Sequence, residues 1–404
     1  MKSIGNKYTI AFSSLLAIIP FTEHIQIVPN ILIGILLLLF PFVIKKRKWI
    51  KPNSTIIYLL ISLILTIGLG IIAHERWEDI SFLIKIITIP IILILSLPIK
   101  DHRIPLYSFL ISSFTLLLIS IINLTFHYFT YHSLNLDVGA DVNKLLMSER
   151  PYLGFIYLIS FCLSLYLKRF QKSKWSKILL NIMAVIFSAF ILYISARLSI
   201  LSLLIIIGSS VFYAKNKKRT FLLSFGSMLT LAAFGFLNPN FISRLTAGFS
   251  QDKIEMQKVI QLEPRTHIWE CSYNISQSDS MTFWGLGFRN TIKNLKDCFS
   301  THDKFLNKGQ QKFFIDSNFN THNQFLNFYL SSGFLSLLLF LILFFVLFKI
   351  YRGNYYSFAL ILALFLFCIF ENVISRQIGA MLFAIVLYLA HSILKNTSKS
   401  DLMN

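Results

Sequence analysis

Twelve runs of mainly apolar residues, separated by shorter polar stretches, occupy most of the chain. Several are near twenty residues long, which is enough for a helix to cross about 30 Å of hydrocarbon. The pattern therefore predicts an all-α, polytopic membrane protein with about twelve transmembrane helices. The runs cover residues 8–22, 25–44, 54–73, 80–99, 104–126, 151–167, 178–195, 198–214, 220–237, 324–348, 355–373 and 377–394.

Two features of this pattern set the domain organisation. Arg197 separates the seventh run from the eighth and predicts a helix break at a membrane surface. A long polar segment, residues 238–323, separates the ninth run from the tenth and is the only segment long enough to form a small structured region outside the membrane. We therefore expect one membrane domain over residues 1–404, with residues 238–323 as a large loop.

The Lys and Arg residues are distributed unevenly between the two sets of connecting segments. With the N-terminus placed in the cytoplasm, the cytoplasmic segments carry twenty-two of them and the short segments on the other face carry five. Cytoplasmic loops of membrane proteins carry such an excess. We therefore expect both termini in the cytoplasm and the large loop on the outer face of the membrane. A net charge of +20 could also suggest a nucleic-acid partner, but its clustering between apolar runs argues against one.

The large loop contains the residue types of soluble protein regions. Pro264 suits the first turn of a helix, and Ile268 and Cys271 then fall near one face of that helix. Residues 284–288, Trp-Gly-Leu-Gly-Phe, predict a tight turn. Cys271 and Cys298 lie in an oxidising compartment, where they either form a disulfide or pack separately, Cys271 on the apolar face of its helix.

Two arginines on the outer face are candidates for binding a diphosphate. Arg197 lies between two apolar runs, where it either anchors a helix end at the membrane surface or holds an anion by bidentate hydrogen bonds. Arg265 lies at the head of the helix that Pro264 opens, where backbone amides also favour an anion. Taken alone, Arg265 is an ordinary solvated loop arginine. Two guanidinium groups at one site would suit a lipid diphosphate.

His322 is the candidate for proton transfer. It lies where the large loop leads into the tenth run, and Asn320 or Thr321 is expected to cap that helix. Positive charge is disfavoured at a helix N-terminus, so we expect a neutral imidazole that accepts a proton from a sugar hydroxyl. An interfacial histidine that bonds only water or lipid would have the same place in the sequence.

Other polar residues near the outer face are weaker candidates for substrate contacts. Lys85 lies inside the fourth run, where it contacts a carrier phosphate or pairs with a neighbouring polar group. Glu371, Arg376 and Gln377 form a polar patch between the last two runs, which lines the site or, in the favoured interpretation, forms a hairpin turn. Arg150, at the end of the second outer loop, is a further candidate.

The sequence lacks the signals of several other chemistries. It has no H-E-x-x-H, no paired C-x-x-C and no Walker loop, and His127 and His132 have no third ligand at a clear spacing. We therefore expect no required metal and no cofactor. The apolar runs also lack lines of Asp and Glu, and no internal repeat is evident. These features favour chemistry at the outer face over a flippase or another polysaccharide transporter.

The order of these motifs resembles the O-antigen ligase and O-antigen polymerase superfamily. The motifs that carry the resemblance are, in order, Ser195-Ala196-Arg197 at an outer helix end, Arg265 with Trp269 in a long outer loop, Gly285 with Gly287 in a turn, and His322-Asn323 followed by Phe325-Leu326 at the start of a run. Each motif is weak alone, and their order and placement make the resemblance specific.

The resemblance implies a GT-C-like fold of spanning helices and a metal-independent, inverting glycosyltransferase. The implied donor is a glycan on undecaprenyl diphosphate. The acceptor is a lipid A core for a ligase, or a second carrier-linked glycan for an O-antigen or capsule polymerase. Carried over by motif, Arg197 and Arg265 would hold the diphosphate and His322 would activate the acceptor hydroxyl. The other residues expected to contact substrate are Asn323, Lys85, Arg150 and Arg376.

Two positions depart from the family pattern. The family often has Gly after the first Arg, where this chain has Leu198. It often has an acidic residue just before the Gly of the tenth span, where Ser331 and Ser332 precede Gly333 here. Neither departure touches the three chemical residues, but both bear on the choice between a ligase, which is preferred, and a polymerase.

Overall fold

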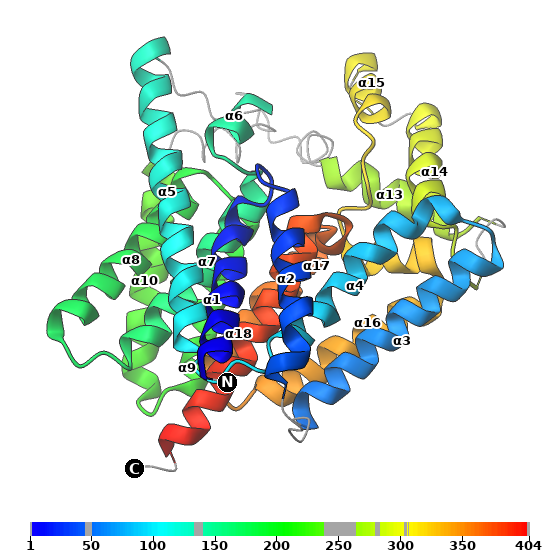
Figure 1. The fold of residues 1–404 in the computed structure, drawn as a ribbon. Coiled ribbons are helices and arrows are strands. Elements are labelled where there is room, and N and C mark those ends of the chain that lie inside the picture. Colours follow the sequence, from blue (N-terminus) through cyan, green and yellow to red (C-terminus); the bar gives the residue numbers. More distant parts are fainter. Residues whose placement is uncertain are drawn as a thin grey trace.

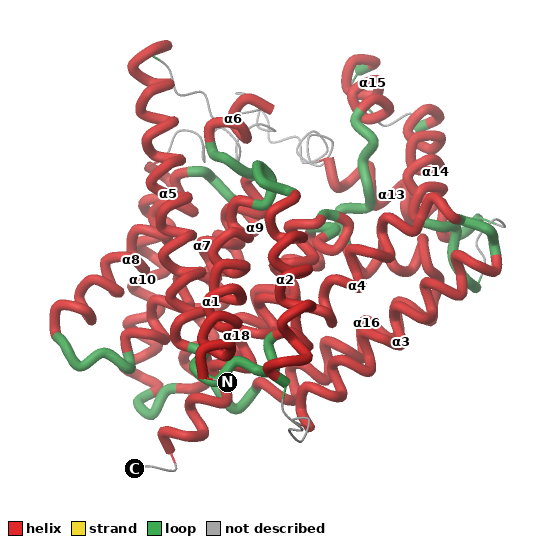
Figure 2. The backbone as a smooth tube through the Cα atoms, viewed as in Figure 1, coloured by secondary structure: helices red, strands yellow, loops and turns green. Residues whose placement is uncertain are grey.

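The computed structural model describes residues 2–44, 51–132, 140–237, 264–278, 283–302, 305 and 307–401. The described chain consists of helices and loops, as Figure 2 shows. The α-helices are α1 (Lys2–Ile18), α2 (Ile27–Val43), α3 (Lys51–Ala73), α4 (Ile80–Leu95), α5 (Arg103–Tyr131), α6 (Ala140–Leu145), α7 (Arg150–Lys168), α8 (Lys174–Tyr193), α9 (Arg197–Tyr213), α10 (Lys217–Leu237), α13 (Pro264–Ser276), α14 (Phe288–Thr301), α15 (Lys308–Asp316), α16 (Gln324–Tyr351), α17 (Tyr355–Phe370) and α18 (Gln377–Asp401). The 3₁₀ turns are η1 (Ile19–Phe21), η2 (Trp77–Asp79) and η3 (Val373–Ser375).

Each of the twelve predicted apolar runs forms a helix. They correspond in order to α1 with η1, α2, α3, α4, α5, α7, α8, α9, α10, α16, α17 and α18. Seven of the described helices are long and apolar enough to cross a membrane, and three more are apolar but shorter. The described part of the chain is therefore all-helical, with the helices of a polytopic membrane protein, while crossing by all twelve stays a prediction.

The helices pack side by side around α18, most of which is buried (Figure 1). α18 contacts α4 and α17, and α3 packs along α16. Figure 1 shows both termini at one end of this bundle and the loop helices α13, α14 and α15 at the opposite end. This separation agrees with the orientation expected from charge, although the sidedness itself and the single-domain organisation stay predictions. Residues 238–263, the first part of the predicted large loop, lie outside the described residues.

The tenth predicted span, α16, is broken at Gly333. Gly333 has φ +82° and ψ 178°, so the helix stops and restarts there. The break leaves carbonyl oxygens unpaired within the helix. Two of them accept from the loop turn, because Leu286 N–H donates to Leu330 O (2.7 Å) and Gly287 N–H donates to Ser331 O (2.8 Å). The Gly-x-Gly turn predicted from sequence is thus the element that fills the break.

Replacing Gly333 by alanine is expected to lower the thermal stability of the purified protein. A Cβ at this position would collide with the carbonyl oxygen of Phe283, and the φ of +82° with ψ of 178° is a backbone conformation that essentially only glycine adopts, which costs another residue about 1–3 kcal/mol. Gly353→Ala is the matched control, because a Cβ there meets nothing within 4 Å. Thermal unfolding of both variants in detergent measures the difference, and equal melting temperatures would contradict the packing described here.

The turn after α3 anchors the loop helices to the bundle. The buried carboxylate of Asp79 accepts hydrogen bonds from the N–H groups of Phe288 (2.8 Å) and Arg289 (2.9 Å) at the start of α14. A carboxylate at a helix N-terminus satisfies backbone donors that have no partner within the helix. The loop helices also have a small apolar core of their own, formed by Ile268, Cys271, Ile275, Leu286, Leu295, Phe299, Phe314 and Leu330.

Candidate active site

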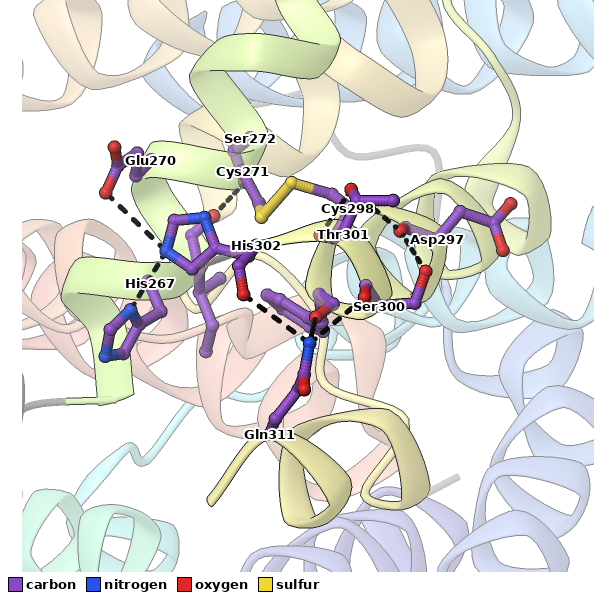
Figure 3. Close-up of a disulfide and its surroundings, with 12 residues drawn as sticks. His267, Glu270, Cys271, Ser272, Asp297, Cys298, Ser300, Thr301, His302 and Gln311 are labelled. Carbon is purple, nitrogen blue, oxygen red and sulfur yellow. Dashed lines mark hydrogen bonds and ion pairs between the residues drawn. A yellow bond between two sulfur atoms is a disulfide. The ribbon is translucent and has the colours of Figure 1, made fainter. Parts of the chain in front are cut away.

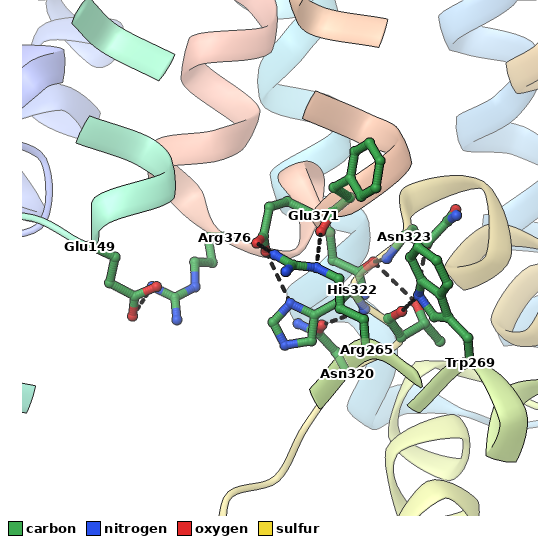
Figure 4. Close-up of polar contacts among 11 residues, drawn as sticks. Glu149, Arg265, Trp269, Asn320, His322, Asn323, Glu371 and Arg376 are labelled. Carbon is green, nitrogen blue, oxygen red and sulfur yellow. Dashed lines mark hydrogen bonds and ion pairs between the residues drawn. The ribbon is translucent and has the colours of Figure 1, made fainter. Parts of the chain in front are cut away.

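A buried carboxylate joins two of the residues predicted to carry chemistry. Glu371, the C-cap residue of α17, is only 7% exposed. Its Oε1 accepts from Nη2 of Arg265 at 2.8 Å, and its Oε2 accepts from Nδ1 of His322 at 3.1 Å (Figure 4). Arg265 comes from the start of α13 and His322 from the turn before α16, so three separate elements meet at one carboxylate. We call Arg265, His322 and Glu371 the outer cluster.

The turn that carries His322 has an uncommon backbone. His322 has φ +43°, in the left-handed region, and its N–H donates to Oδ1 of Asn320 at 3.0 Å. The helix cap is Asn323, whose Oδ1 accepts from Leu326 N–H at 2.9 Å. The expectation that Asn320 or Thr321 caps the helix was therefore wrong. Asn320 cannot serve because its side chain holds the turn at His322 instead.

Contacts from α17 and α13 fix this turn in place. Oδ1 of Asn372 accepts from Asn323 N–H (2.8 Å) and from the hydroxyl of Thr321 (3.0 Å). The indole N–H of Trp269 donates to the carbonyl oxygen of Thr321 at 3.0 Å. The Arg-x3-Trp motif therefore makes two contacts in the site. Its arginine binds Glu371, and its tryptophan holds the turn that carries His322.

The charges of the outer cluster fix the tautomer of His322. Burial raises the pKa of the Glu371 carboxyl, but its hydrogen bonds and charge interactions with His322 and Arg265 outweigh burial, so this pKa lies below its ordinary value. An ionised carboxylate only accepts hydrogen bonds, so Nδ1 of His322 must carry the proton in the bond to Glu371. In the neutral ring, Nε2 is then the proton acceptor.

The low pKa of Glu371 predicts a stability change in acid. A carboxyl whose pKa is lower in the folded protein stabilises the fold above its unfolded pKa of about 4.3. That stabilisation is lost as the pH falls through the folded pKa. We expect the melting temperature of the wild type to fall more steeply below about pH 4 than that of Glu371→Gln, which lacks the titrating group. Parallel pH profiles for the two proteins would show that Glu371 does not contribute in this way.

Arg197 lies at the same end of the bundle as the outer cluster. Helix α9 runs antiparallel to α17, because the ring of Tyr213 at its end packs 5.5 Å from the ring of Tyr355 at the start of α17. The N-terminus of α9, which begins with Arg197, therefore lies level with Glu371 at the end of α17. Arg197 is exposed, and the predicted break before it is confirmed, with Ser195 at φ +51°.

The remaining substrate candidates have protein partners. Nζ of Lys85 donates to Ser375 O at 2.6 Å, so it pairs with a neighbouring polar group, one of the two alternatives expected. Nη1 of Arg376 forms ion pairs with Glu149 (2.7 Å) and Glu23 (3.6 Å). Arg150 is buried at the start of α7, and Asn323 caps α16. Their contact with a substrate stays a prediction.

One protein family matches part of the chain. Residues 182–341 match the family model described as O-antigen ligase. This match supports the resemblance to the O-antigen ligase and polymerase superfamily. The match runs from within α8 to within α16 and includes Arg197, Arg265 and His322. No curated protein matches the chain.

The match over residues 182–341 confirms the resemblance found in the motifs, which lie within it. Together with the long apolar helices, it supports a multi-pass membrane protein of polysaccharide biosynthesis. The matched region includes the break at Gly333 and the turn at Gly285 that fills it. It ends before Glu371, the residue that joins the outer cluster.

The sequence analysis named Glu371 but favoured a hairpin turn over a place for it in the site. The polar patch after α17 does form the expected hairpin turn, through η3, and its glutamate also joins Arg265 to His322. Asn372 was not predicted, and Thr321 was expected only as a helix cap. A signal was present, since a carboxylate in a short outer gap between two apolar runs needs a cationic partner when it is buried.

The two loop cysteines form a disulfide. Cys271 of α13 and Cys298 of α14 are bonded (Figure 3). The disulfide alternative is therefore confirmed, and Cys271 is also fully buried in the apolar core of the loop helices. The disulfide joins α14 to the helix whose first turn carries Arg265, and so helps to fix the position of that arginine.

Proposed function

We propose that this protein is a membrane glycosyltransferase of the O-antigen ligase type. It would transfer a glycan en bloc from undecaprenyl diphosphate to a lipid A core on the periplasmic face of a bacterial inner membrane, with both termini in the cytoplasm. The observation that carries the proposal is the buried Glu371, which holds a guanidinium and an imidazole together at the end of the bundle opposite the termini.

In the proposed reaction, His322 acts as the general base. Its Nε2 takes the proton of an acceptor hydroxyl, and the hydroxyl oxygen bonds to the anomeric carbon of the first donor sugar. The bond from that carbon to the diphosphate oxygen breaks, and its electron pair leaves with the carrier diphosphate. A single displacement of this kind inverts the anomeric configuration. Glu371 would hold the Nδ1–H tautomer and stabilise the imidazolium that forms.

The arginines would stabilise the leaving group. Negative charge grows on the diphosphate as the glycosidic bond breaks, and fixed cations placed there in advance lower the barrier. Arg265 is held by Glu371 and by the carbonyl oxygen of Phe370 (3.3 Å from Nε), and Arg197 stands at the same end of the bundle. Two guanidinium groups can supply this charge, so the proposed transfer requires no metal. Lys85, Arg150, Arg376 and Asn323 are proposed to contact the rest of the substrate.

A polymerase that extends a carrier-linked glycan is the second candidate. The family covers both activities, and the chemistry of the outer cluster suits either acceptor. The absence of an acidic residue before Gly333 and the presence of Leu198 after Arg197 mark this chain as atypical in its closer family. The acceptor therefore has to be identified by experiment.

Glycan transfer by the purified protein tests the proposal. A carrier-linked glycan donor would be supplied in the presence of EDTA, with either a lipid A core or a second carrier-linked glycan as acceptor. Product on the lipid A core that His322→Ala cannot make identifies a ligase, and a lengthened carrier-linked ladder identifies a polymerase. No product with either acceptor would count against both candidates and favour a transporter.

A further inference from the structure

Two cations lie over one aromatic ring where α14 meets α4. Nζ of Lys85 is 4.7 Å from the centroid of the Phe82 ring, and Cζ of Arg289 is 5.9 Å from the same centroid. Lys85 and Phe82 belong to α4, and Arg289 belongs to the first turn of α14. A ring face attracts a cation, but two cations that share one ring repel each other. The pair is therefore a local concentration of positive charge.

Neither of these charges is neutralised by an ion pair within the part of the chain that the structure describes. Nζ of Lys85 donates to the carbonyl oxygen of Ser375 (2.6 Å), which is a neutral partner. Asp79 interacts electrostatically with Arg289, but its carboxylate already accepts two backbone N–H groups. Arg376 is a further positive neighbour of Lys85, and it has carboxylate partners of its own. An anion from outside the chain would therefore neutralise Lys85 and Arg289.

Lys85 lies on a face of α4 that points out of the bundle. Ile84 beside it is 58% exposed, and Ser81, one turn earlier on the same face, is exposed as well. Trp77, just before α4, is 57% exposed, and tryptophan is enriched at the membrane–water interface. A lysine a short way inside an apolar helix extends its ammonium group toward that interface. We therefore expect the two cations at the depth of the lipid headgroups.

The stacking of Phe82 on Phe288 fixes the two cations relative to each other. The centroids of these rings lie 4.9 Å apart at an interplanar angle of 10°, and Phe288 directly precedes Arg289. Phe288 is buried, and its N–H donates to Asp79 in the turn before α4. The start of α14 is thereby docked on α4, which lowers the cost of ordering both cationic side chains around one anion.

We propose that Lys85 and Arg289 bind the headgroup of an anionic phospholipid at the end of the bundle that carries the loop helices. The phosphate oxygens would accept from the ammonium and guanidinium groups, and the acyl chains would lie along the exposed face of α4 around Ile84. Lys85 is also a proposed substrate contact, and the phospholipid would occupy its place while no donor is bound. The lipid takes no part in glycosyl transfer, so the proposal does not depend on the proposed function.

Lipid retention by the full-length protein tests the site. The protein would be reconstituted in nanodiscs of phosphatidylcholine and phosphatidylglycerol in equal amounts, and the lipids that stay bound after transfer to detergent would be identified by native mass spectrometry. We expect the wild type to retain phosphatidylglycerol in preference, and this preference to fall about fivefold in Lys85→Gln and in Arg289→Gln. Arg289 is exposed, so its variant remains informative if Lys85→Gln folds poorly. Lys312→Gln, which removes an exposed cation from α15, is the matched control.

Added salt gives a second readout, because screening weakens the attraction between a headgroup and exposed cations. The preference of the wild type should fall as salt is added, and that of the two variants should change less. The assignment fails if both variants retain phosphatidylglycerol as the wild type does, or if Lys312→Gln loses as much of it as they do. It also fails if the variants keep phosphatidylglycerol but no longer bind undecaprenyl diphosphate, because the two cations would then belong to the donor site alone.

Discussion

His322→Ala is expected to reduce glycan transfer by about 10²–10⁴-fold while the protein stays folded and inserted in the membrane. The imidazole is the group of the outer cluster that can take a proton from the acceptor hydroxyl at neutral pH. Its side chain is 26% exposed, so its removal leaves no large cavity in the core. Transfer rates with saturating donor and acceptor measure the effect directly.

Glu371 supplies the test that separates chemistry from structure. If Glu371 acts through His322, then Glu371→Gln should lower the transfer rate and change its pH profile. The double variant Glu371→Gln with His322→Ala should then be little slower than His322→Ala alone. Groups that act as a unit show such non-additive losses. His74→Gln serves as the control for a histidine outside the site. Wild-type transfer by His322→Ala would remove the histidine from the mechanism.

The sequence predicted the helices well because their signal is local. Each apolar run is long enough to specify a helix by itself, and Arg197 marks a helix start because a charge interrupts an apolar stretch. Pro264 marks the first residue of α13 for an equally local reason, since proline is tolerated in the first helical turn. Such features need no knowledge of which helix lies next to which.

The features that were missed depend on contacts between distant residues. The break in α16 at Gly333 is stabilised by Leu286 and Gly287, which come from a different segment. Glu371 meets His322 across 49 residues of sequence and Arg265 across 106. The sequence does not show which cations meet the Glu371 carboxylate, so a hairpin turn was favoured over a place in the site.

The prediction of the residue that caps α16 was wrong for a related reason. Asn320, Thr321 and Asn323 all have side chains that can cap a helix, and local preference does not choose among them. The choice is made by Asn372, which accepts from the Asn323 N–H and from the Thr321 hydroxyl. The cap thus follows from the docking of α17, and it sets the position of His322.

Arg265→Ala is expected to reduce transfer by about 10²–10³-fold, the loss typical of removing one donor that stabilises transition-state charge. Arg265→Lys should recover only part of the activity, because an ammonium group cannot reproduce the paired hydrogen bonds of a guanidinium. Arg265→Ala also has a structural effect, which must be separated from its effect on the reaction. Arg265 neutralises a buried carboxylate, so its loss leaves Glu371 without that partner.

The double variant Arg265→Ala with Glu371→Gln makes that separation, because it removes the stranded charge together with the arginine. We expect its melting temperature to recover toward the wild type while its transfer rate stays as low as that of Arg265→Ala. Because Glu371→Gln alone should also lower the rate, that single variant is the reference. A double variant that is no slower than Glu371→Gln would make Arg265 a structural partner of Glu371 that does not act on the diphosphate. Arg197→Ala provides the comparison, since Arg197 is exposed at the same end of the bundle. Its variant should therefore lose transfer with little change in melting temperature.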